Sequence, residues 1–169
     1  MAVREIRIYP DAVLKQLAKP VPGVDDEVRR LMDDMVETMH ESNGIGLAAP
    51  QVGVSQRVIV VDVSHTSEDA PPPVALANPE VVAAEGEVEF EEGCLSLPGF
   101  LTKVKRSSEI TVKALDRDGK AVTIEAGGIF AIALQHEMDH LDGTLILDRA
   151  SGLKREFYKK RIRKQADRA

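Results

Sequence analysis

The stretch Gln135-His-Glu-Met-Asp-His-Leu141, which follows an apolar run, contains two histidines four residues apart. In a helix, residues i and i+4 lie on the same face, so the imidazoles of His136 and His140 can bind one metal ion. Glu137, beside the first histidine, can reach a metal-bound water as a general base. The alternative is a solvated polar helix face, but burying histidines next to apolar neighbours without partners is costly. The pattern therefore predicts a metal-binding helix over residues 128–141.

Cys94, the only cysteine in the chain, is the candidate for a third ligand, because a catalytic metal usually has three protein ligands and one open position. It lies in Glu91-Glu-Gly-Cys-Leu-Ser-Leu-Pro98, whose composition predicts a tight loop or a strand end that presents the sulfur. A lone cysteine is more often a small buried hydrophobe. A nucleophilic Cys–His pair is also compatible with the residues, but it leaves the second histidine and Glu137 without a role. A three-ligand metal site uses all four residues.

A glycine motif, Gly44-Ile-Gly-Leu-Ala-Ala49, matches the dinucleotide-binding fingerprint G-x-G-x-x-A, and Asp62 has a suitable spacing for a ribose contact. That fingerprint must follow a strand and open a helix. Here a helical pattern over 25–41 precedes it, and Pro50 stops any helix from continuing. We therefore expect the first glycine, Gly44, to cap the preceding helix. The second should allow a ligand to approach the backbone closely.

Three motifs in this order resemble those of the peptide deformylases of the bacterial type: Gly44-Ile-Gly-Leu-Ala-Ala-Pro-Gln51, Glu92-Gly-Cys-Leu-Ser96 and the stretch 135–141. The likeness runs from about residue 6 to about residue 148, and the basic tail is also similar. The resemblance implies a metal-dependent hydrolase that removes the formyl group from N-formylmethionine at the start of newly made polypeptides and releases formate.

The resemblance also implies a role for individual residues. One divalent metal, Fe(II), would be held by Cys94, His136 and His140, with zinc, nickel or cobalt able to substitute. Glu137 would be the general acid/base. The oxyanion hole would be formed by two further groups, the side-chain amide of Gln51 and the backbone N–H of Leu95.

Substrate contacts are expected along the glycine motif and in an apolar pocket for the methionine side chain. Each apolar candidate is equally compatible with a core position. The residues expected to bind substrate are Gly44, Ile45, Gly46, Phe90, Glu92, Ile129, Ile132 and Ala133. We also hypothesise that Arg106 pairs with Asp139 and braces the metal helix from outside the ligand shell.

Two other classes of function share some of these features. A zinc peptidase with an HExxH helix takes its third ligand from a histidine or glutamate after the helix, whereas Asp142 and Asp148 are the nearby carboxylates here. A noncatalytic metal-binding or redox-sensing module would use Cys94, but a structural site is normally closed by four protein ligands. Both classes fit the sequence less well than a peptide deformylase does.

Apolar patterning predicts an α+β fold, with antiparallel or mixed sheets packed around the central metal-binding helix. Besides 128–141, helices are expected over 10–18 and 25–41. Strands are expected over 56–63, 74–77, 85–90, 102–106, 109–115 and 120–126.

The chain has 169 residues, of which 43% are hydrophobic, as expected for a single domain. We expect residues 1–150 to form one catalytic domain and 151–169 to form a basic C-terminal helix or tail of the same domain. The N-terminus lacks a signal-peptide pattern, and no apolar stretch approaches the roughly 20 residues that span a bilayer. These features and the lone cysteine predict a cytoplasmic enzyme with no membrane or DNA partner.

The basic tail differs sharply in charge from the rest of the chain. Residues 154–169 carry a net charge of +6, while the whole chain carries −6, so the remainder carries about −12. This asymmetry indicates a polyanionic partner or a solvated amphipathic helix. The resemblance favours the first, because bacterial relatives can dock at the ribosome through such a helix. Contacts with ribosomal RNA are expected from Lys159, Lys160, Arg161, Arg163 and Lys164.

Overall fold

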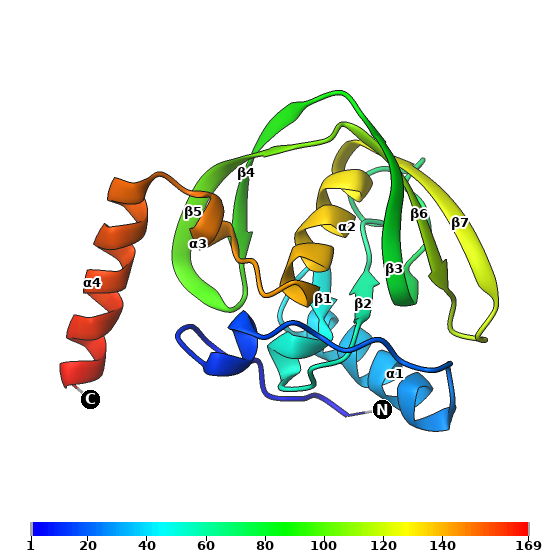
Figure 1. The fold of residues 1–169 in the computed structure, drawn as a ribbon, viewed down its shortest axis with the longest axis horizontal. Coiled ribbons are helices and arrows are strands. Elements are labelled where there is room, and N and C mark those ends of the chain that lie inside the picture. Colours follow the sequence, from blue (N-terminus) through cyan, green and yellow to red (C-terminus); the bar gives the residue numbers. More distant parts are fainter. Residues whose placement is uncertain (1, 169) are drawn as a thin grey trace.

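The structure is a computed structural model that describes residues 2–168, and it has an α+β fold, as predicted (Figure 1). Helix α2 (Gly128–Leu141) lies between a five-stranded sheet and a two-stranded hairpin. The pairs between these strands are antiparallel. In spatial order the larger sheet contains β1 (Gly46–Ala48), β2 (Val58–Val61), β3 (Val74–Glu85), β6 (Glu109–Leu115) and β7 (Ala121–Gly127). The hairpin consists of β4 (Val88–Cys94) and β5 (Leu97–Arg106).

The other helices surround this core. Helix α1 (Asp26–Glu41) starts after Asp25, whose side chain accepts a hydrogen bond from the backbone N–H of Val28 and so caps the helix. The remaining helical segments are η1 (Ala12–Lys15), η2 (Ala49–Val52), α3 (Ile146–Arg149) and α4 (Gly152–Arg168).

Strand β2 explains why the helices pack on both sides of the sheet. All four of its residues are buried. Ile59 and Val61 belong to the core cluster that includes α2, while Val58 and Val60 belong to the cluster that includes α1. Successive side chains of a strand point to opposite faces, so a continuous apolar run requires cover on both. This arrangement fixes α2 against one face of the sheet.

The end of α1 corrects one expectation about the glycine motif. The left-handed residue after the helix is Asn43, with φ 56°, and not Gly44. The N–H of Gly44 bonds to the carbonyl of Met39 at 2.9 Å, and that of Asn43 bonds to the carbonyl of His40 at 3.1 Å. These two bonds form a Schellman motif, in which asparagine can replace the usual glycine because it tolerates the left-handed region. Gly44 is then the second residue past the cap.

Several predicted elements differ in length from the observed ones. The expected helix over 10–18 is only the short 3-10 helix η1. Strand β3 continues beyond 74–77 because Asn78 takes a positive φ of 51° and the register shifts, which carries the chain past Pro79. In the hairpin, β4 starts and ends later than 85–90, and β5 begins before 102–106. The later end of β4 places Cys94 at a strand end, as expected from its neighbours.

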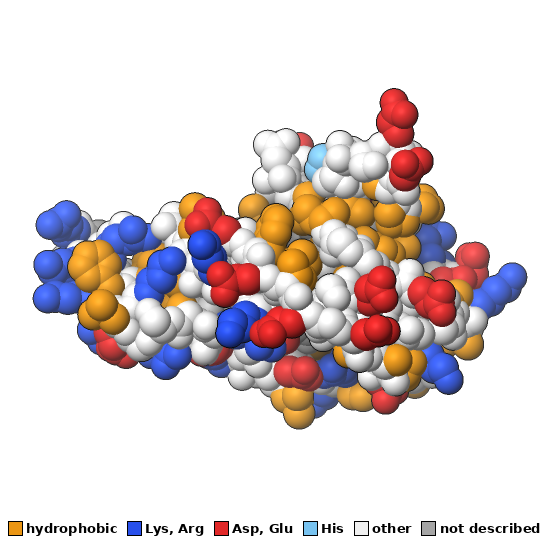
Figure 2. All heavy atoms as spheres, turned by 90° about the horizontal axis from the view of Figure 1, so that it is seen from above, with side chains coloured by type: hydrophobic (Ala, Val, Ile, Leu, Met, Phe, Trp, Pro, Cys, Tyr) orange, Lys and Arg blue, Asp and Glu red, His pale blue; other side chains and the backbone are white. Residues whose placement is uncertain are grey.

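Helix α4 lies at the outer side of the hairpin, away from the sheet (Figure 1). It is attached through Tyr158, its buried residue, whose ring packs against Phe100. Figure 2 shows many Lys and Arg side chains around this helix, with hydrophobic side chains among them. Within residues 2–168, no helix combines the length and the apolar character that crossing a bilayer requires.

Candidate active site and metal centre

The three predicted ligands converge in the structure. Cys94 ends β4, while His136 and His140 lie one turn apart on α2. Their candidate ligand atoms lie within 4.8 Å of one another, and the Sγ of Cys94 is 3.4 Å from the Nε2 of His140. One thiolate and two imidazoles form a donor set that suits iron, zinc, nickel or cobalt. The helical spacing and the strand end therefore place three ligands around one point.

The electrostatics of the cluster also fit a cation. Burial opposes a charge on His136, but the nearby Glu137 carboxylate, Cys94 and Glu92 outweigh it and raise the pKa of this imidazole well above its ordinary value. His140 differs, because burial lowers its pKa and keeps the ring neutral, which is the form that a metal requires. The site thus combines an attraction for positive charge with a neutral imidazole ligand.

Glu137 is the unpaired acid of this site. Its Oε1 lies 3.9 Å from the Nε2 atoms of both His136 and His140. This oxygen is buried and has no hydrogen-bond partner among the described residues. Burial raises the pKa of Glu137 to about 7. A carboxyl group that titrates near neutrality and faces the ligands can both accept and return a proton.

Glu92 holds the first histidine in place. Its Oε1 accepts a hydrogen bond from the Nδ1 of His136 at 2.9 Å, which directs Nε2 toward the cluster. The same carboxylate receives a fork from Arg106, with distances of 2.9 Å from Nε and 2.8 Å from Nη2. Burial opposes ionisation of Glu92, but the hydrogen bonds from Arg106 and His136 outweigh it and lower its pKa. Glu92 was expected to contact substrate, yet its carboxylate is engaged by these two side chains.

Arg106 pairs with Asp139, as hypothesised. Its Nη1 donates to the Oδ2 of Asp139 at 2.6 Å, and the Arg106 side chain is only 2% exposed. Burying a guanidinium is tolerated when its donors are paired with carboxylates. Arg106 therefore binds Glu92 within the hairpin and links the hairpin to α2 through Asp139.

Gln51 presents an amide donor in a fixed orientation. Its Oε1 accepts a hydrogen bond from the backbone N–H of Ala48 at 2.9 Å, so its Nε2 points the other way. That nitrogen lies 3.6 Å from the Sγ of Cys94 and 3.1 Å from the Oγ of Ser96. Leu95, the other expected oxyanion donor, lies between these two residues and lines the same pocket. Sequence reasoning did not find the contact of Ser96, although this residue closes the second motif.

Gly46 also permits a second close approach, which was not expected from the sequence. A Cβ atom at this position would lie 2.6 Å from the Oε2 of Glu137. The glycine therefore leaves room for the acid, in addition to lining the pocket. It follows Ile45, whose carbonyl accepts a hydrogen bond from the N–H of Asp62 at 2.8 Å. Because Gly46 is on β1 and Glu137 is on α2, the close contact between them places β1 directly against the metal helix. This packing excludes the arrangement of a dinucleotide site, in which the glycine motif connects a strand to the helix that follows it.

A pocket of about 540 Å³ opens over these groups. Its size lies within the usual range for small-ligand sites. The predicted substrate-binding residues in its wall are Gly44, Ile45, Gly46, Phe90, Glu92, Ile129, Ile132 and Ala133. Sequence reasoning missed Phe100 and Leu101, which join the wall from β5. Leu101 faces Gly93 across the hairpin, so only the strand register could have revealed it.

Comparison with known proteins gives a consistent result. The family model described as polypeptide deformylase matches residues 3–156. The peptide deformylase of Thermodesulfovibrio yellowstonii is 53% identical over 163 residues, which cover 96% of this chain and 98% of the relative. The crystal structure of peptide deformylase from Ehrlichia chaffeensis has a TM-score of 0.91 at 39% identity, covering 98% of each chain. A structure of peptide deformylase from the same organism in complex with actinonin has a TM-score of 0.92 at 40% identity. The chain belongs to the peptide deformylase family.

Proposed function

We propose that this chain hydrolyses the formyl group of N-formylmethionyl peptides and releases formate and a free amine. The observation that carries the proposal is the buried, unpaired Glu137 beside the Cys94, His136 and His140 cluster, at the floor of an apolar pocket. Membership of the peptide deformylase family supports the same reaction. We also propose a cytoplasmic location, because the proposed substrates are newly made polypeptides.

The metal would be held by Cys94, His136 and His140, and we propose Fe(II), with zinc, nickel or cobalt able to substitute. A divalent metal bound there would supply Lewis acidity, which lowers the pKa of a coordinated water toward 7. Glu92 would keep the Nε2 of His136 directed at the ion through the 2.9 Å contact with Nδ1.

Glu137 would carry the proton. It would accept a proton from the attacking water and return it to the departing amine nitrogen as the C–N bond of the formamide breaks. A pKa of about 7 suits both transfers, because a group that titrates near the working pH is present in both forms. A bound cation would lower this pKa, which favours the ionised form that begins the reaction.

Two donors would stabilise the negative charge that develops on the formyl oxygen. The Nε2 of Gln51 is already directed into the site, because its Oε1 is held by Ala48. The backbone N–H of Leu95 would be the second donor. Donors that need no reorganisation are effective, and losing one typically costs about 100- to 1000-fold in rate.

The pocket would select methionine by its apolar wall. We propose that Ile129, Ile132 and Ala133 contact the methionine side chain from α2, with Ile45 and Phe90 on the facing walls. The backbone of Gly44, Ile45 and Gly46 would pair with the backbone of the substrate.

The test is formate release from formyl-Met-Ala-Ser by protein purified without oxygen, with metal content measured on the same sample. We expect release with about one metal per chain, and no cleavage of the unformylated peptide. Cleavage of unformylated peptide would indicate a zinc peptidase. Bound metal without formate release would indicate a noncatalytic module.

We further propose that residues 1–150 form one catalytic domain and that 151–169 belong to it as a basic extension that contacts the ribosome. On α4, Leu153 and Phe157 are 85% and 72% exposed and lie four residues apart. Figure 2 shows hydrophobic side chains among the Lys and Arg side chains around this helix. Arg161 is turned toward the body, since its Nη2 lies 3.3 Å from the carbonyl oxygen of Gly99 on β5. Lys160, Arg163 and Lys164 are exposed and remain the stronger candidates for contacting RNA.

Ribosome binding can be measured at several salt concentrations. Changing Lys160 and Lys164 to alanine should weaken binding and reduce the slope of log affinity against log salt by about 1 to 2. Changing Lys113 and Lys120, two exposed lysines of the catalytic body, provides the matched control. Equal effects of the two pairs would contradict a role for α4.

A further inference from the structure

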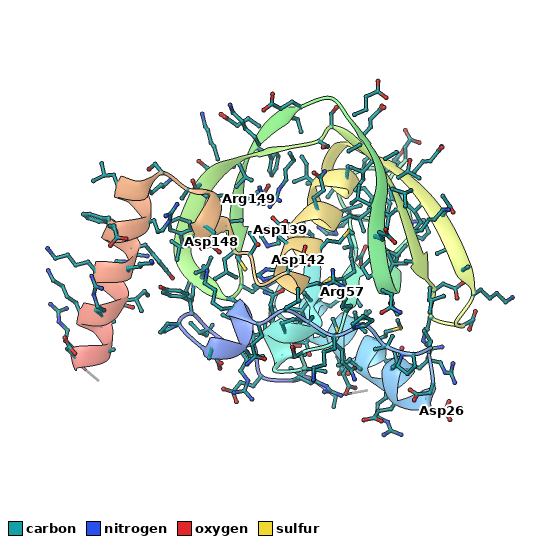
Figure 3. All side chains as sticks on the ribbon, viewed as in Figure 1. Asp26, Arg57, Asp139, Asp142, Asp148 and Arg149 are labelled. Carbon is teal, nitrogen blue, oxygen red and sulfur yellow. The ribbon has the colours of Figure 1, made fainter. Side chains whose placement is uncertain are left out.

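Arg149 makes a two-point contact with the metal helix. Its Nε lies 2.7 Å from the Oδ2 of Asp139, and its Nη2 lies 2.9 Å from the Oδ1. Figure 3 shows the two side chains meeting between α3 and α2. A parallel pair of N–H···O bonds fixes the plane of a carboxylate as well as its position. Arg149 therefore determines how Asp139 is oriented.

Asp139 uses the same oxygen for a second arginine. Its Oδ2 also accepts from the Nη1 of Arg106 at 2.6 Å. The other donors of Arg106 hold Glu92, and Glu92 in turn holds the Nδ1 of His136. A continuous series of charge-assisted hydrogen bonds thus runs from the end of α3 to a predicted metal ligand.

The burial of these groups makes the series sensitive to its outer end. The Arg106 side chain is 2% exposed, so it relies on its two carboxylates to offset the loss of water. The Arg149 side chain, in contrast, is 41% exposed. If Arg149 is removed, Asp139 can rotate toward solvent. Arg106 then loses its contact with Asp139, and the orientation of its fork on Glu92 is less well fixed.

The position of Arg149 is set by the packing of the residues that precede it in α3 and its turn. Helix α3 follows a tight turn at Gly143, where an added Cβ would lie 2.6 Å from the carbonyl oxygen of Lys15. Ile146 and Leu147 are buried, and Asp148 accepts two 2.7 Å contacts from the ammonium of Lys15. The helix is therefore anchored independently of the Asp139 contact.

We propose that Arg149 is a positioning residue of the metal site, which orients His136 through Asp139, Arg106 and Glu92. The proposal rests on the metal site of the proposed function and extends it to a residue outside the pocket. It requires no contact between Arg149 and the substrate.

The test uses the full chain loaded with cobalt, whose visible spectrum reports on its ligands. The rate of cobalt release to a chelator is measured for the native chain, Arg149→Ala, Arg149→Lys and Arg106→Ala. Loss of an outer partner of a metal ligand typically costs about 10- to 100-fold in affinity, which we expect for Arg106→Ala. For Arg149→Ala, one step further out, we expect release to be faster by about 3- to 10-fold with a shifted spectrum. The release rate of Arg149→Lys should lie between those of Arg149→Ala and the native chain, because lysine keeps the positive charge but cannot make the two-point contact with Asp139.

Arg117→Ala is the matched control. Arg117 makes the same two-point contact with Asp33, at 2.9 and 2.8 Å, and is 50% exposed. This variant should leave the spectrum and the release rate unchanged. A second control is Arg149→Ala combined with Arg106→Ala, which should release cobalt no faster than Arg106→Ala alone.

The proposal is overturned if Arg149→Ala behaves like Arg117→Ala, or if its effect multiplies with that of Arg106→Ala. The assay needs no substrate, so either result can be obtained in a protein that still releases formate. Failure of the chain to bind cobalt at all would instead remove the metal site on which both proposals depend.

Discussion

Helices α2 and α4 have similar lengths, 14 and 17 residues, but opposite environments. Nine residues of α2 are buried, including the acid Glu137 and the metal-ligand candidate His140. Helix α4 buries Tyr158 and leaves most of its basic side chains on the surface. The contrast separates two roles of a helix: the side chains of α2 act in surroundings that neighbouring elements provide, whereas α4 exposes basic side chains that we propose to contact the ribosome.

The comparison predicts that changes around α2 alter kcat, whereas changes in α4 alter how firmly this helix is held on the body of the protein. The largest effect should come from Glu137→Gln, which removes the proton carrier but keeps the size of the side chain. We expect kcat for formate release to fall by about 100- to 10,000-fold with metal content unchanged. Metal analysis and formate release on one sample provide the measurement. A variant that keeps its rate would refute the role of Glu137.

A smaller loss is expected when the packing around that acid is disturbed. In Gly46→Ala the new Cβ would lie 2.6 Å from the Oε2 of Glu137, so the carboxylate must move. A misplacement of this kind lowers kcat by about 10- to 100-fold. Gly152→Ala, at the start of α4, is the matched control, because a Cβ there meets nothing within 4 Å. If both alanines reduce kcat equally, the contrast between the helices fails.

Tyr158→Ala should detach α4 without touching the chemistry. The Tyr158 ring lies 4.9 Å from that of Phe100, and its hydroxyl donates to the carbonyl of Pro98 at 3.2 Å. Truncation should lower the free energy of local opening by about 2 to 3 kcal/mol, with kcat within about twofold of the native value. The measurement is the rate of proteolysis within α4, which should rise as the helix opens more often. In Tyr158→Phe, which keeps the ring, α4 should open much less readily than in Tyr158→Ala.

Acid should affect the body and not the attachment of α4. Burial opposes ionisation of Asp62, but hydrogen bonds from Ser64 and His40 outweigh it and lower the pKa of Asp62 to about 2. Because the folded-state pKa lies below the ordinary value of 3.8, the stabilisation is complete above about pH 4 and is lost as the pH falls toward 2. We expect about 1 kcal/mol, after allowing for solvent near the pair.

Chemical unfolding between pH 5 and pH 2 can test this effect. Asp62→Asn should remove this part of the pH dependence, while Tyr158→Ala should retain it. The opposite pattern would mean that α4, and not the body, limits stability in acid.

The parts of the fold that were predicted correctly have strong local signals. The i and i+4 histidines and the apolar run before them gave the bounds of α2, and regular alternation gave those of β6. The outer half of β3 has no alternation because its residues from Glu80 onward are exposed, so the strand could not be seen beyond Pro79. A positive φ at Asn78, which continues the strand there, has no signal of its own in the sequence.

The site divides in the same way. The motif residues converge as expected. They could be predicted because the residue types in each motif indicate a chemical role by themselves. The contact between Arg106 and Asp139 was inferred from their closeness to the motifs. Arg149 was not found, because an arginine on a four-residue helix pairs with α2 only after the turn at Gly143 has set its position. Such pairings depend on tertiary geometry, which the local sequence does not encode.

The convergence of Cys94 with His136 and His140 has a consequence for folding. Cys94 lies 42 residues before His136 and 46 before His140, and it comes from a different element, a strand instead of the helix. An ion held by all three would act as a removable cross-link between the hairpin and the central helix. An ion that binds only the folded state adds stability in proportion to the logarithm of its concentration. The midpoint of thermal unfolding should therefore rise with metal supply, even when no peptide is present.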